Sequence, residues 1–110
     1  VFKECAKINK DCLKGLFTKK GVSAMTLERA AYELGRRHAG PELDFILKQV
    51  SHADLNVRAA MLHSLRLAKP KTGDLQLDEI LKRDGKNTKY IKLNEDIKRT
   101  RISIARGDFN

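Results

Sequence analysis

Apolar residues recur at intervals of three and four along most of the chain, which is the spacing of one face of an α-helix. This pattern predicts a first helix over Phe2–Phe17, with Leu13 and Leu16 among its apolar positions. A second helix is expected to begin at Ser23 or Thr26, because either side chain can cap a helix. The predicted buried face of this second helix consists of Leu27, Ala30, Ala31 and Leu34.

Two further helices are predicted between residues 41 and 68. Pro41 is expected to occupy the first position of the third helix, where the N–H that proline lacks would have no partner. The apolar face of the third helix is predicted to be Leu43, Ile46, Leu47 and Val50. Asp54 is the expected cap of the fourth helix. The predicted buried face of the fourth helix is Leu55, Ala59, Leu62 and Leu65, with Val57 and Met61 beside it.

The segment Lys69–Gly73 is the clearest break in the helical pattern, because it places a proline and a glycine among polar residues. A short helix is predicted over residues 74–83, followed by a polar turn over 84–88. The last segment is ambiguous, because its apolar spacing fits a helix while residues 101–105 alternate as in a strand. Helix is favoured, because Asn94–Arg99 is a poor strand. The apolar positions that fit the helix are Tyr90, Leu93, Ile97 and Ile104.

These elements predict an all-α fold, namely a compact right-handed array or bundle of about five to six short helices. The chain has 110 residues, which is enough for one modest core and therefore for a single helical domain over residues 1–110. Within it we expect a repeat-like core over 1–68, a linker over 69–73 and a basic C-terminal helical segment over 74–110. That segment is expected to pack onto the core through Leu75, Leu77, Ile80 and Leu81.

The tripeptide Arg-Ala-Ala occurs at residues 29–31 and again at 58–60, and this recurrence predicts a repeated helical unit. Over residues 26–68 the chain resembles a HEAT-type helical repeat, in which an apolar helix, a turn with an aspartate and a second helix opening with Val-Arg follow one another. The matching residues are Phe45–Val50, Asp54, Val57–Arg58, Ala60 and Leu65. The resemblance implies a HEAT-like middle with stacked helix pairs, and the alternative is an unrelated all-α bundle.

The chain is strongly basic, with 23 lysines and arginines against 14 acidic residues and a formal net charge of +9. Residues 82–106 contain nine basic and three acidic residues, so this segment is where a polyanion is expected to bind. The alternative is a generic basic protein whose lysines only keep it soluble. The predicted contacts are cations for phosphates and one tyrosine for base stacking. These residues are Arg36, Arg37, Lys82, Arg83, Lys86, Lys89, Tyr90, Lys92, Lys98, Arg99 and Arg101.

Cys5 and Cys12 are the two cysteines of the chain, and both fall in the first predicted helix. Two helical turns would separate them by about 10 Å, which is too far for a disulfide. Reduced cysteines in turn indicate an intracellular, reducing compartment, either cytoplasm or nucleus. We expect no membrane contact, because the sequence contains neither a signal peptide nor an apolar stretch of spanning length.

No catalytic signature occurs in the sequence, so the protein is not expected to be an enzyme. His38, His52 and His63 form neither an i,i+4 pair nor a Cys/His cluster, and therefore no metal is expected. No cofactor or small-molecule substrate is indicated either. A small metal-independent nuclease built from histidine, lysine and arginine would have this size and charge, and it stays a minor alternative.

The leading expectation is therefore a non-enzymatic helical domain that binds RNA or DNA through phosphate contacts of its basic C-terminal segment. The second is a scaffold or adaptor module that binds an acidic protein partner, since helical repeats usually present a concave surface to other proteins. Charge reversal of Lys98, Arg99 and Arg101 is expected to weaken nucleic-acid binding and to leave stability nearly unchanged.

Overall fold

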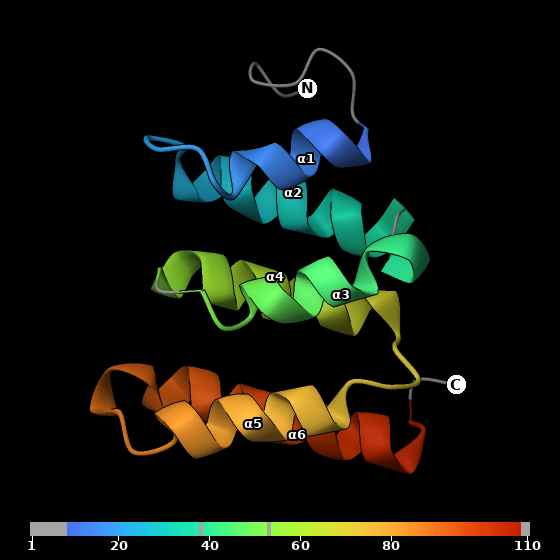
Figure 1. Cartoon of the computed structure of the whole chain (residues 1–110), viewed down its shortest axis with the longest axis vertical. Helices are drawn as coiled ribbons and strands as arrows, with labels where there is room; N and C mark the ends of the chain where they lie inside the picture. The colour runs from blue at the N-terminus through green and yellow to red at the C-terminus, as the bar shows by residue number, and fades with distance from the viewer. Residues whose placement is uncertain (1–8, 38, 53, 109–110) are drawn as a thin grey trace. The chain divides into compact units, whose positions relative to one another are not determined.

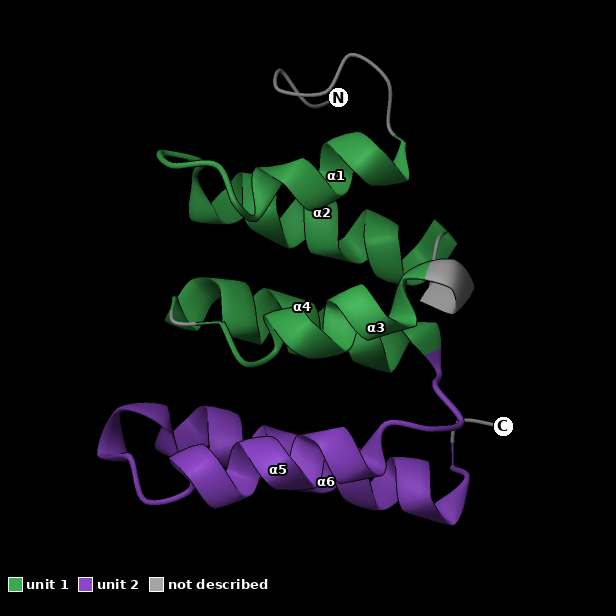
Figure 2. Ribbon diagram, in the orientation of Figure 1, with its two compact units in different colours: residues 1–68 green, residues 69–110 purple. Residues whose placement is uncertain are grey.

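The computed structural model describes residues 9–37, 39–52 and 54–108, which form six α-helices, one 3₁₀ helix and no strand (Figure 1). The all-α prediction is thereby confirmed. The chain divides into two compact units, residues 1–68 and 69–110 (Figure 2). The first contains α1 (Lys10–Leu16), α2 (Ala24–Arg37), α3 (Ala39–Gln49) and α4 (Leu55–Ala68). The second contains α5 (Asp74–Asp84), the 3₁₀ helix η1 (Thr88–Tyr90) and α6 (Ile91–Arg106).

Helix α4 is the centre of the first unit, because it packs against both α2 and α3, while α1 packs on α2. The α2–α4 contact is very close at Gly35, where a Cβ atom would lie within 2.9 Å of the Ser64 Oγ and closer still to its carbonyl oxygen. A glycine is therefore required at this crossing. The buried apolar side chains of the unit are Leu13, Leu16, Phe17, Leu27, Ala30, Ala31, Leu34, Ile46, Leu47, Val50, Val57, Ala60, Met61, Leu62 and Leu65.

Side-chain caps begin three helices of the first unit. Asn9, Ser23 and Asp54 precede α1, α2 and α4, and a side-chain oxygen of each accepts a backbone N–H from the first turn. The predicted cap Asp54 is confirmed, and of the two alternatives Ser23 and Thr26 it is Ser23 that caps α2. The cap at Asn9 was not anticipated. These bonds satisfy first-turn donors that have no partner within the helix.

Two predicted helix starts are wrong. The first helix begins at Lys10, because Asn9 has extended backbone angles (φ −117°, ψ 161°); the rest of the predicted Phe2–Phe17 helix, residues 2–8, lies outside the described residues. Helix α3 begins at Ala39, so Pro41 is its third residue rather than its first. Proline is tolerated there, because no N–H of the first turn is needed for an intrahelical hydrogen bond.

The prediction of two reduced cysteines is also wrong, because Cys12 is disulfide-bonded. The distance argument assumed one continuous helix through both cysteines, but α1 begins only at Lys10. The other cysteine of the sequence, Cys5, lies outside the described residues. The sequence-based argument for a reducing compartment therefore loses its support.

The buried face of α4 differs from the prediction. Leu55 and Ala59 are exposed, whereas Val57, Ala60 and Met61 are buried. The buried surface extends around more of the helix than a single stripe, because α2 and α3 both pack against it. The predicted face was thus only partly correct, because Leu62 and Leu65 are buried as expected but Leu55 and Ala59 are not.

The two Arg-Ala-Ala tripeptides do not occupy equivalent positions. Ala30 is fully buried while Ala59 is exposed, and Arg29 is exposed while Arg58 is buried. Helices α2 and α4 are both 14 residues long, and α4 begins at Leu55, 31 residues after the start of α2 at Ala24. The tripeptides, 29 residues apart, are therefore two residues out of this register. The resemblance to HEAT repeats stays a prediction.

The second unit is an antiparallel helical hairpin (Figure 1). Its buried apolar residues are Leu77 and Ile80 of α5 and Leu93, Ile97 and Ile104 of α6, so the helical alternative for the last segment is correct. The Asn94 side chain of α6 donates a hydrogen bond of 2.9 Å to the carbonyl oxygen of Asp84 at the end of α5. Leu75, predicted to be buried, is 69% exposed, because it lies on the face of α5 opposite Leu77.

Candidate nucleic-acid interface

Two predicted contact residues, Arg36 and Arg37, lie in the last turn of α2 in the first unit. Both pair with Glu33, whose carboxylate lies 2.6 Å from Nε of Arg37 and 3.5 Å from Nη2 of Arg36. The guanidinium of Arg36 also lies over the ring of Tyr32, 5.4 Å from its centroid. These arginines therefore already have local partners.

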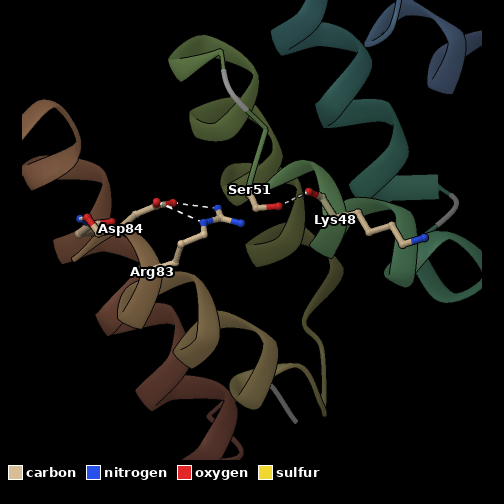
Figure 3. A network of polar contacts seen from close by, with 5 residues as sticks. Lys48, Ser51, Arg83 and Asp84 are labelled. Carbon is tan, nitrogen blue, oxygen red and sulfur yellow. Dashed lines mark hydrogen bonds and ion pairs between the residues drawn. The ribbon is translucent and has the colours of Figure 1, made fainter. Parts of the chain in front are cut away.

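The other nine predicted residues belong to the second unit, where α5 supplies Lys82 and Arg83. The ammonium of Lys82 lies 3.2 Å from the carboxylate of Asp78. Arg83 donates two hydrogen bonds to Asp84, of 3.2 Å from Nε and 2.8 Å from Nη2 (Figure 3). The hydrogen bond to Asp84 raises the pKa of Arg83, so this guanidinium keeps its charge but has an acidic neighbour.

Asp78 connects the two helices of the hairpin, because it forms ion pairs both with Arg101 of α6 and with Lys82 of α5. The Nε atom of Arg101 lies 3.4 Å from one carboxylate oxygen of Asp78, and Lys82 approaches the other. Arg101 is therefore part of the α5–α6 packing. The structure brings Lys82 and Arg101 together around a carboxylate rather than on an open cationic surface.

Lys98 and Arg99 on α6 form only weak local ion pairs. Lys98 lies 3.4 Å from Glu95 and Arg99 lies 3.5 Å from Asp96, each three residues earlier in the helix. All four side chains are well exposed, and exposed pairs of this kind contribute little because water screens them. A phosphate that replaces either carboxylate would therefore break an ion pair that contributes little free energy.

Three further exposed cations are Lys86, Lys89 and Lys92, which we call the turn cluster. They lie in the connection between α5 and α6 and in the first turn of α6, and all three are exposed. Within residues 69–108, no ion pair joins any of them to a carboxylate. The ammonium of Lys89 lies 5.9 Å from the centroid of the Tyr90 ring. The cluster thus places three lysines within seven residues without acidic partners.

Backbone hydrogen bonds fix the connection that carries the turn cluster. The N–H of Gly85 donates to the carbonyl of Leu81 at 2.7 Å, and that of Asn87 donates to the carbonyl of Asp84 at 3.0 Å. The side chain of Asn87 then accepts the N–H of Lys89 at 3.0 Å and so begins η1. The lysines are therefore carried on an ordered turn.

One exposed cation of α6, Arg106, was missing from the predicted set. Lys92, Arg99 and Arg106 follow one another at intervals of seven residues, so they lie along one side of the helix. All three are exposed, and we call them the α6 row. The seven-residue spacing is visible in the sequence and was the signal that could have revealed Arg106.

Tyr90 is half-buried, so only part of its ring is available for the predicted stacking on a base.

Of the histidines, His52 accepts the N–H of Asp54 through Nδ1 at 2.9 Å, His63 is exposed, and His38 lies outside the described residues. The described part of the chain contains no group of three or more side chains placed to hold a metal ion. It also contains no helix that is long and apolar enough to cross a membrane.

No family model, no curated protein and no solved structure matches this chain.

Proposed function

We propose that the second unit is a non-enzymatic nucleic-acid-binding element that contacts phosphates through the turn cluster. The observation that carries the proposal is the exposure of Lys86, Lys89 and Lys92 without a carboxylate partner within residues 69–108. Phosphate contacts require exposed, spaced cations, and they give affinity that depends little on base sequence. RNA and DNA both provide such phosphates.

The ordered turn supports this proposal. A cation held on a fixed backbone loses less conformational freedom on binding than one on a mobile loop. The hydrogen bonds of Gly85 and Asn87 fix the backbone between α5 and α6, so only the lysine side chains have to become ordered.

We also propose an intracellular location, because it would bring the protein into contact with nucleic acid. This rests on the proposed ligand and not on the cysteines, since Cys12 is disulfide-bonded.

The proposal is tested with the triple variant Lys86→Gln/Lys89→Gln/Lys92→Gln. Its matched control is Lys19→Gln/Lys20→Gln/Lys48→Gln, which removes three exposed lysine charges from the first unit. Fluorescence polarisation with a labelled 20-base-pair DNA duplex gives the affinity at increasing salt concentration. For three lost phosphate contacts, the slope of log K against log salt decreases by about 2.7.

The control variant has the same net charge as the turn variant, but its substituted lysines lie outside the proposed site, so it is expected to keep nearly the parent slope. Equal losses in the two variants would mean that only total charge matters, which contradicts the proposed site. Thermal melting of all three proteins verifies that the substitutions leave the fold intact.

A second candidate function, binding of an acidic protein partner, is favoured by one face of α2. Met25 is 70% and Tyr32 is 42% exposed, and with Arg36 they lie on the face of α2 opposite its buried residues. Methionine, tyrosine and arginine are the residue types enriched at protein interfaces. Titration with polyglutamate separates the candidates: Tyr32→Ala should weaken polyglutamate binding and leave duplex binding unchanged if this face binds an acidic protein.

A further inference from the structure

We infer that the nucleic acid is double-stranded and that its backbone lies along the α6 row. This inference rests on the proposed function and adds the class of ligand. It starts from the positions of Lys92, Arg99 and Arg106, which extend the exposed cations from the turn along the whole of α6.

The row is straight and regularly spaced. Seven residues of α-helix rise about 10.5 Å, so the three cations extend over about 21 Å. Each interval of seven residues rotates the side chain by only about 20° around the helix, so all three stay on one side. Over about 10.5 Å of its axis a duplex carries about six negative charges, so each cation of the row can lie near several phosphates.

The side chains of the row are available to a ligand. Within the described residues, neither Lys92 nor Arg106 forms an ion pair with a carboxylate, and both are exposed. Arg99 has the 3.5 Å contact to Asp96, in which its own side chain is 78% exposed. A phosphate contact would therefore displace only one weak surface interaction.

A rigid row of cations favours a rigid ligand. Duplex DNA stays straight over about 150 base pairs, so its phosphates keep a fixed spacing before they are bound. A single strand would first have to be extended along the helix, and this ordering opposes binding. A duplex also has the higher charge density, with about one negative charge per 1.7 Å of its axis.

The same region offers little to unpaired bases. Single-stranded nucleic acid is usually held by exposed aromatic rings on which successive bases stack. Within residues 69–108 Tyr90 is the only aromatic residue, and it is half-buried with Lys89 beside its ring. Residues 69–108 thus have the cations of a backbone-binding surface without the aromatic surface that single strands use.

The test compares a 20-base-pair DNA duplex with one of its own strands, for the parent and for Arg99→Gln/Arg106→Gln. We expect the duplex salt slope of this variant to be lower than that of the parent by about 1.8, and its single-strand slope to stay the same. Between 50 and 200 mM salt, the parent should then lose about tenfold more duplex affinity than the variant loses.

Two further variants make the result specific. Arg99→Lys/Arg106→Lys keeps both charges and should retain the duplex slope of the parent. The turn variant Lys86→Gln/Lys89→Gln/Lys92→Gln should weaken binding of both ligands, because the turn contacts phosphates of either kind.

The outcomes separate the inference from the proposed function. If the parent binds neither ligand, the proposed function is overturned and the inference with it. If the parent binds but Arg99→Gln/Arg106→Gln weakens both ligands equally, or weakens neither, the proposed function stands and the duplex inference is overturned.

Discussion

In the first unit, Lys10 and Lys14 both approach Glu42, whose side chain is only 9% exposed; Lys14 lies 2.9 Å from its carboxylate and also over the ring of Phe45. A further cation of this unit, Arg58, is buried in α4. In the second unit, by contrast, the acidic partners are all more exposed than Glu42, from 15% at Asp84 to 57% at Glu95, and the turn cluster has none within residues 69–108.

The difference shows that basic residues in two regions of one chain can serve different purposes. Cations that meet a buried carboxylate satisfy a charge that would otherwise be expensive to bury, so they belong to the fold. Cations without such a partner contribute little to the fold and are free to meet a ligand. Counting charges along the sequence does not separate the two kinds.

The largest effect is expected at Arg58, where Arg58→Ala removes a side chain that is 2% exposed. The cavity and the lost packing should lower the free energy of unfolding by about 2–5 kcal/mol, as for other large buried side chains. The control Arg66→Ala, at a half-buried arginine of the same helix, should lower it by less than about 1 kcal/mol. Urea unfolding measures both, and equal values would contradict a structural role for the buried cation.

A second test concerns the close helix contact of the first unit. Gly35→Ala places a methyl group against Ser64 and should force α2 and α4 apart, lowering the free energy of unfolding by about 1–3 kcal/mol. Gly15→Ala in α1 is the control, because no atom lies within 4 Å of the new methyl group. It should stabilise the protein by up to about 1 kcal/mol through helix propensity. A stabilising Gly35→Ala would show that the helices are not in tight contact there.

Periodicity was sufficient to predict the helices, because amphipathic spacing and caps such as Ser23 and Asp54 are local properties of the chain. It was insufficient for the buried face of α4, which has apolar residues on several sides. Only the positions of α2 and α3 determine that Ala60 is buried and Ala59 exposed. The choice of face is therefore a tertiary property.

The candidate site divides in the same way. That Lys86, Lys89 and Lys92 are exposed follows from a polar turn, and the sequence predicted it. That Arg101 is held by Asp78 does not, because the two residues are 23 positions apart and meet only when α5 and α6 pair. The disulfide at Cys12 was missed for a related reason, since the actual start of α1 depends on the cap at Asn9.

A third test compares one lysine from each unit. Among the described residues, Lys14→Gln leaves Glu42 with only the 3.9 Å contact to Lys10. It should lower the free energy of unfolding by about 1–2 kcal/mol, because the carboxylate is largely buried. Lys92→Gln should change it by less than about 0.5 kcal/mol. Thermal or urea unfolding of the two single variants measures the difference. If Lys92→Gln is the more destabilising variant, the contrast between the two units is wrong.

The smallest expected effects distinguish two arginines of α6 that lie two residues apart. Arg101→Gln removes the cross-helix contact to Asp78 and should lower the free energy of unfolding by about 0.5–1 kcal/mol, since both side chains are partly exposed. Arg99→Gln should have almost no effect on stability, but should decrease the salt slope of duplex binding by about 0.9. Arg101→Gln should leave that slope close to the parent value. Unfolding and polarisation measurements on the same two variants therefore give opposite rankings, and identical rankings would contradict the separation of structural from ligand-binding cations.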